Sequence, residues 1–170
     1  MRFRISPEWE ARAIAEGNAR QDYAEGARLA NYGREIGSIK ERANHIMGCR
    51  CEIAVAARLH LPWSAQVGIL VGIDVGGKVE VRGRRIPGKG TDLACRIGRD
   101  KPNRPYVLIH CFDTGEFEII GWLYGWECAA RANDCLVRYE ITYVPPPYHA
   151  FVELEELVRK SAVQLQLDLA

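Results

Sequence analysis

The feature that most constrains the fold of this chain is a change of hydrophobic period that follows Trp63. Before it the sequence is typical of helices, and Ser6 and Pro7 are a capping residue and a first-turn residue that can begin one. After it, apolar and β-branched residues form short runs separated by glycine and proline, which is typical of strands. Helices followed by a run of strands predict an α+β fold, in which a sheet packs against helices.

The expected elements follow from this pattern. Helices are expected over about residues 7–18, 21–30, 38–59, 126–133 and 152–163, and Gly48 is a point at which the third could break. Strands are expected over residues 67–75, 78–84, 92–97, 106–112, 117–123 and 138–144, and the nearly continuous apolar run at 106–112 indicates a strand covered on both faces. Together they predict one mixed, mostly antiparallel sheet of about five strands flanked by helices. A single domain is expected over residues 1–170, with a helical part at 1–62, a sheet-rich core at 63–145 and a C-terminal helix at 146–170.

Length and charge limit the classes of function. A chain of 170 residues is long enough for one compact domain with a sizeable core. The formal net charge of +1 creates no global field toward an anionic partner, so contacts with nucleic acid would come from local basic clusters. No signal peptide and no membrane span are expected. The expected compartment is the cytoplasm of a bacterial host cell, where the six cysteines would be reduced.

Three carboxylates and one cation stand out as Glu52, Asp74 and Glu80-Val81-Arg82. Glu52 falls on or beside the apolar stripe of its helix, where a carboxylate is costly to bury unless it is paired or binds a cation. The alternative, a purely structural role, is that Glu52 pairs with Arg50 or Arg58 of the same helix.

The turn at Gly76-Gly77 decides whether Asp74 and Glu80 can cooperate. A two-residue loop would place Glu80 on the opposite face from Asp74. A three-residue loop that includes Lys78 would put both carboxylates on one face, and glycine at a left-handed position makes this longer form reasonable. Two facing carboxylates repel unless a divalent cation lies between them. Magnesium suits such a site because it prefers oxygen ligands and usually takes one or two carboxylates. The alternative is a solvated, charged face of a hairpin.

At these residues the chain resembles the PD-(D/E)xK nuclease superfamily, in its small phage-encoded form. The resemblance covers about residues 48–122, with a helix Glu, an Asp at a strand end and Glu-x-Lys on the next strand, although here Arg82 stands in place of Lys. It implies a restriction-endonuclease-like core and hydrolysis of DNA phosphodiester bonds with Mg²⁺ or Mn²⁺. It also implies that Glu52, Asp74 and Glu80 bind the metal, and that these three together with Arg82 are the catalytic residues.

Arg82 leaves alternatives open. Lysine can lose a proton and position a water, whereas arginine is always charged and binds phosphate as a fork. Arg82 is therefore suited to contact the scissile phosphate and unsuited to act as a base. The alternatives are a catalytically inactive nucleic-acid-binding protein on the same fold, and an interaction or inhibitor protein that docks through its charged face.

Basic residues near the carboxylates are candidates for phosphate contacts, with ordinary surface charge as the alternative. They are Arg84, Arg85, Lys89, Arg96 and Lys101, with Arg99 and Arg104 in the same cluster. The aromatic residues Trp63, Trp122, Tyr124 and Trp126 could stack on bases but are more often found in a core. The C-terminal Gln166-Leu167-Asp168-Leu169-Ala170 resembles the peptide that holds the bacterial sliding clamp, but it lacks the final aromatic residue, and a frayed helix end is the alternative.

Overall fold

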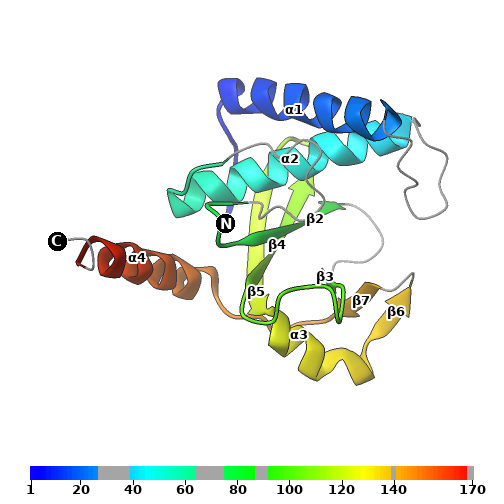
Figure 1. Cartoon of the computed structure of the whole chain (residues 1–170). Helices are drawn as coiled ribbons and strands as arrows, with labels where there is room; N and C mark the ends of the chain where they lie inside the picture. Colours follow the sequence, from blue (N-terminus) through cyan, green and yellow to red (C-terminus); the bar gives the residue numbers. More distant parts are fainter. Residues whose placement is uncertain (27–38, 64–74, 87–91, 139–140, 168–170) are drawn as a thin grey trace.

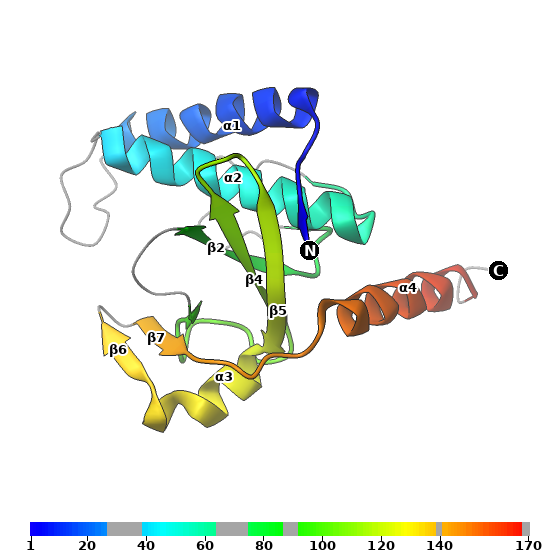
Figure 2. The same cartoon turned by 180° about the vertical axis from the view of Figure 1, so that it is seen from behind.

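The computed structural model describes residues 1–26, 39–63, 75–86, 92–138 and 141–167 (Figure 1). It confirms the α+β class. Two long helices, α1 (Pro7–Gly26) and α2 (Ile39–Leu59), lie side by side over a four-stranded sheet, and a smaller sheet with a short helix lies at the opposite end (Figures 1 and 2).

Helix α1 is one continuous helix, so the expected division near residue 18 is wrong. Asn18, which could have ended the helix by bonding to its own backbone, instead accepts a hydrogen bond from Arg42 of α2 at 3.3 Å. Gly17 lets the two helices meet, because a Cβ built there would lie 2.5 Å from the Ile46 Cα. Helix α2 also continues through Gly48, where the cost of a glycine is only about 1 kcal/mol.

The larger sheet has the strand order β1-β5-β4-β2. Its members are β1 (Arg2–Phe3), β2 (Glu80–Ile86), β4 (Pro105–Phe112) and β5 (Phe117–Tyr124). β4 pairs antiparallel with β5, as expected for consecutive strands joined by a tight turn, whereas β2 pairs parallel with β4. The sheet is therefore mixed, and both Glu80 and Arg82 lie on its β2 edge.

A second sheet of three antiparallel strands corrects the expectation of a single five-stranded sheet. It is formed by β3 (Leu93–Cys95), β7 (Ile141–Val144) and β6 (Leu136–Arg138) in the order β3-β7-β6. β3 pairs antiparallel with β7, which ends just before Pro145, a residue that cannot donate to a ladder. Between β5 and β6 lie helix α3 (Gly125–Arg131) and a 3₁₀ turn (Ala132–Asp134).

The two faces of β4 pack into two different cores, which confirms that this strand is covered on both sides. Val107, Ile109 and Cys111 join the larger core under α2. Tyr106 and Leu108 join a smaller core with the second sheet and α3. On the α2 side the packing is tight at Gly83 of β2, where a Cβ would lie 2.6 Å from the Cys51 Sγ.

Helix α4 (Phe151–Leu167) ends the described chain and extends away from the rest of the molecule (Figures 1 and 2). Its first turns are held by the buried residues Leu154 and Val158. Gln166 and Leu167 of the clamp-like peptide belong to this helix, and residues 168–170 lie outside the described residues. Among the described helices, none has a stretch that is both apolar enough and long enough to cross a membrane.

Candidate functional site

The turn before β2 has the three-residue form. Val75 and Val79 bridge across it, and each accepts a hydrogen bond from the backbone N–H of the other, at 3.0 Å and 3.1 Å. Gly76 and Gly77 both adopt left-handed backbone angles, with φ of 57° and 65°, which only glycine adopts freely. The loop is thus the length required for Asp74 and Glu80 to share a face. Asp74 itself lies outside the described residues.

Glu80 is the first residue of β2 and is buried, with 8% of its surface exposed. Its Oε1 accepts a short, charge-assisted hydrogen bond from the Arg104 Nη1 at 2.6 Å. Among the residues that the structure describes, its Oε2 contacts only the Arg82 Nη1, at a long distance of 3.5 Å. One oxygen of this carboxylate is therefore firmly held and the other is weakly engaged.

Arg82 points from β2 toward the second sheet. Its Nε donates to the Ala94 carbonyl of β3 at 3.1 Å, and its Nη2 contacts the Asp100 carboxylate at 3.3 Å. The guanidinium also lies over the Tyr106 ring, 4.9 Å from its centroid. Burial, and then the charge of Asp100, raise the pKa of Tyr106 to about 12, so its hydroxyl stays protonated. In this arrangement Arg82 connects two sheets and a loop.

Glu52 is held differently from Glu80. Arg20 of α1 grips it as a fork, with Nη1 and Nη2 each 2.7 Å from a different carboxylate oxygen. The indole N–H of Trp63 donates to the Glu52 Oε2 at 2.9 Å. The expected alternative partners are occupied elsewhere, since Arg50 pairs with Glu10 and Arg58 with Glu155.

Sequence reasoning missed Arg20 because it is 32 residues from Glu52 and reaches it only through the packing of α1 on α2. The signal that could have found it is Gly17, one turn earlier on α1, which marks the point of closest approach between the helices. Trp63 connects Glu52 to the turn, because it also bridges to Val75. Within the described ranges, no group of three or more Asp, Glu, His or Cys side chains could hold a metal ion.

The predicted basic residues differ in burial and in the contacts that they make. The Arg84 Nε donates to the Asp92 carbonyl at 3.1 Å, and burial lowers the pKa of this side chain. Arg85 is exposed, Arg96 is half-buried and Lys101 is exposed in a loop. Lys89 lies outside the described residues. Arg104, a member of the predicted basic cluster, makes the shortest contact with Glu80, a pairing that the sequence did not predict.

The aromatic residues differ in burial. Trp63 and Trp122 are buried in the larger core, as expected. Trp126 is 52% exposed, so its assignment to the core is wrong. Its ring is nearly parallel to that of Tyr124, with an interplanar angle of 17° and centroids 6.2 Å apart.

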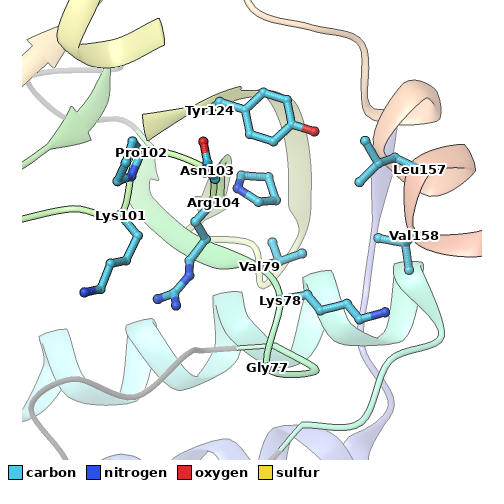
Figure 3. A pocket seen from close by; sticks show the side chains of 11 residues that line it. Gly77, Lys78, Val79, Lys101, Pro102, Asn103, Arg104, Tyr124, Leu157 and Val158 are labelled. Atoms are coloured by element: carbon cyan, nitrogen blue, oxygen red, sulfur yellow. The ribbon is translucent and has the colours of Figure 1, made fainter. Parts of the chain in front are cut away.

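A pocket of about 490 Å³ opens beside Glu80 (Figure 3). Its cationic wall contains Lys78, Lys101 and Arg104, and its aromatic wall is Tyr124. Two aliphatic side chains of α4, Leu157 and Val158, close a third side. Arg104 belongs both to this pocket and to the carboxylate site, so the two are contiguous.

Comparison of this chain with protein-family models, with curated proteins and with solved structures gives no match.

Proposed function

We propose that this protein is a metal-dependent nuclease of the phage-encoded type that hydrolyses phosphodiester bonds of DNA, with a role in DNA processing or recombination in the bacterial cytoplasm. The observation that carries the proposal is the three-residue turn between Val75 and Val79, because β2 then begins with the buried carboxylate Glu80. Helix α2, which carries Glu52, packs on the same strand at Gly83, on the face opposite to the one that Glu80 takes. A helix lying on a mixed sheet supports the finer assignment to a restriction-endonuclease-like core.

The described carboxylates fit a divalent cation unequally. Glu80 suits Mg²⁺ or Mn²⁺ because it is a hard oxygen ligand whose Oε2 has only one long contact. Both oxygens of Glu52 accept short hydrogen bonds, so Glu52 would join the ligands only if Arg20 released one of them. Asp74 and Glu80 are therefore the principal proposed ligands, with Glu52 as the third. When bound, the metal supplies a water of lowered pKa and neutralises charge on the phosphate.

The arginines would serve binding and orientation. Arg104 holds Glu80 Oε1 with one of its five N–H groups, so other donors can face a phosphate. Arg82 contacts both Glu80 and Asp100, and in the proposal it stabilises negative charge at the scissile phosphate. Arg85 and Lys101, which are exposed, would guide the DNA backbone together with Lys89.

The direct test is cleavage of plasmid, branched and single-stranded DNA with Mg²⁺ or Mn²⁺. We expect the wild type to cut at least one substrate, and Asp74→Ala and Glu80→Ala to lose at least about a hundredfold in rate, as expected when a transition-state interaction is removed. Glu156→Ala, which removes an exposed carboxylate of α4, is the matched control and should cut normally. A wild type that cuts nothing, or an Asp74→Ala variant that cuts equally well, would contradict the proposal.

A second candidate is a nucleic-acid-binding protein without catalytic activity. The observation that favours it is the engagement of Arg82 with Asp100 and the Ala94 carbonyl, which gives this side chain a structural role. This function would show as salt-dependent DNA binding that EDTA does not change. Arg82→Lys distinguishes the two candidates, because a gain of cleavage in this variant would indicate a site that has lost its chemistry.

A further inference from the structure

We propose that the pocket beside Glu80 binds one unpaired nucleotide of a DNA strand, with the phosphate on its cationic wall and the base on its aromatic wall. The inference rests on the proposed function, because the nucleotide would belong to the strand that enters the Glu80 site. It adds the substrate class: single-stranded, flapped or branched DNA in preference to an intact duplex.

Three cations line the cationic wall, more than the carboxylates of the described residues neutralise. Lys78, Lys101 and Arg104 all line the pocket, and in Figure 3 the charged ends of Lys101 and Arg104 point to one side of it while that of Lys78 points to the other. The described carboxylate in contact with this wall is Glu80, which takes one hydrogen bond from Arg104. The pocket therefore attracts an anion, and arginine beside lysine is a combination that binds phosphate well.

The opposite wall is aromatic and apolar. Tyr124 lines the pocket across from Lys78 and Arg104, and Leu157 and Val158 of α4 flank it (Figure 3). Trp122 meets the Tyr124 ring edge-on at 5.0 Å, and Trp126 lies nearly parallel to it, so the ring is fixed in place. A fixed ring near cations is an arrangement on which unpaired bases stack, independently of their sequence.

The loop that carries Lys101 and Arg104 is preorganised. Gly125 N–H donates to the Arg104 carbonyl at 3.0 Å, and Trp126 N–H donates to the Pro102 carbonyl at 2.9 Å. A Cβ at Gly125 would collide with the Lys101 backbone, so this glycine allows the loop to approach α3 closely. Little ordering is therefore required when a ligand enters.

The size and position of the pocket favour an unpaired nucleotide. A volume of about 490 Å³ lies within the range of roughly 300–1,000 Å³ that is usual for small-molecule sites. The stacked bases of a duplex cannot enter a concave pocket without unpairing, which costs a few kcal/mol. Arg104 connects the pocket to Glu80, so a nucleotide bound here would place its neighbouring phosphate toward the carboxylate site.

The test is fluorescence anisotropy in EDTA, which prevents metal-dependent cleavage, with a fluorescein-labelled oligothymidine of roughly ten nucleotides and a blunt duplex of the same length. We expect the single strand to bind at least about tenfold more tightly than the duplex. Tyr124→Leu should weaken single-strand binding by roughly tenfold, while Tyr124→Phe, which keeps the ring, should bind like wild type. Lys78→Ala should weaken binding to the single strand, and Lys160→Ala, on α4 outside the pocket lining, should not.

The outcomes separate this inference from the proposed function. Equal binding of single strand and duplex, with no effect of Tyr124→Leu or Lys78→Ala, overturns the pocket assignment even if the protein cuts DNA. Single-strand binding that depends on Tyr124 and Lys78, in a protein that cuts no substrate, supports the pocket and overturns the nuclease. If Tyr124→Leu fails to fold by circular dichroism, the Lys78→Ala and Lys160→Ala pair still decides the result.

Discussion

Glu52 and Glu80 are both buried glutamates paired with arginine, and they differ in how completely they are satisfied. Glu52, 6% exposed, receives two bonds of 2.7 Å from Arg20 and one from Trp63. Glu80, 8% exposed, receives one short bond from Arg104 and has one weakly engaged oxygen beside a pocket. Burial alone therefore does not identify a ligand-binding carboxylate. A carboxylate oxygen that is weakly hydrogen-bonded indicates a ligand-binding site better than burial does.

The largest expected effect is on stability at Glu52. Glu52→Ala would leave the Arg20 guanidinium largely buried without its counter-charge, which typically costs about 3–5 kcal/mol of unfolding free energy. Glu80→Ala should cost less, about 1–2 kcal/mol, because Arg104 makes one short hydrogen bond to Glu80 where Arg20 makes two to Glu52, and because Arg82 keeps Asp100. Urea unfolding followed by circular dichroism measures both values.

The double variant Arg20→Met/Glu52→Leu is the control for this difference. Replacing a buried ion pair by apolar residues of similar size is often neutral or stabilising, so the double variant should recover most of the loss seen in Glu52→Ala. Equal losses of unfolding free energy in Glu52→Ala and Glu80→Ala would show that the two carboxylates are held alike and would contradict the difference between them.

The next effect concerns the helix contact that brings Arg20 to Glu52. Gly17→Ala would place a Cβ against the backbone of Ile46, and overpacking of this kind costs about 1–3 kcal/mol. Gly48→Ala is the matched control, since a Cβ there meets nothing within 4 Å and should stabilise α2 by about 0.5–1 kcal/mol. Thermal unfolding midpoints that fall in Gly17→Ala and rise in Gly48→Ala would confirm the contact, and a neutral Gly17→Ala would contradict it.

Local sequence signals predicted much of what positions Glu80. Two adjacent glycines indicated a turn with left-handed residues and left its length open between two and three residues; the three-residue form is the one present, and it leads into Val79 and Val81, which lie in the core. The apolar run at 106–112 predicted a strand covered on both faces, and β4 has this form. These features depend on backbone conformation and on which face a side chain takes, and both are encoded within a few residues.

Features that depend on distant partners could not be predicted in the same way. The alternation in residues 80–86 determines which face of the sheet each side chain takes, but not which strand pairs with this one. β2 pairs parallel with β4, about 25 residues away. The patterns at 92–97 and 138–144 are those of ordinary strands, yet β3 and β7, which lie within these ranges, belong to a separate sheet. Arg20 and Arg104, which hold the two glutamates, are likewise brought there by tertiary packing.

A smaller effect tests which carboxylate takes a cation. If Asp74 and Glu80 bind a divalent ion, Ca²⁺ at about ten times its Kd should stabilise the wild type by about 1.4 kcal/mol. This gain should disappear in Asp74→Ala and Glu80→Ala. Glu52→Gln, although less stable at the start, should keep most of the gain because the Glu52 oxygens are already occupied. Complete loss of the gain in Glu52→Gln would mean that Arg20 releases Glu52 when the metal binds.

The smallest expected effect is a pH dependence beside the Glu52 pair. Burial, and then the positive charge of Arg20, lower the pKa of His45 from 6.5, with Glu41 acting in the opposite direction and Arg42 in the same one. The unfolded chain therefore binds a proton more readily than the folded protein does. This contribution to stability is present above about pH 6.5 and is lost as the pH falls through the lower, folded pKa.

Urea unfolding measures the free energy of unfolding at about pH 7.5 and about pH 5, and the wild type should be less stable at the lower pH. In His45→Gln this acid-induced loss should be smaller, by less than about 1 kcal/mol. In Arg20→Met/Glu52→Leu the repulsion from Arg20 is gone, so the pKa of His45 should rise. The contribution of His45 to the stability difference between the two pH values should then shrink. Glu80→Ala, in the other region, should leave the His45 contribution unchanged, because Glu80 is not among the charges that act on His45. A shift in Glu80→Ala as large as in the double variant would show that the two carboxylates belong to one electrostatic unit.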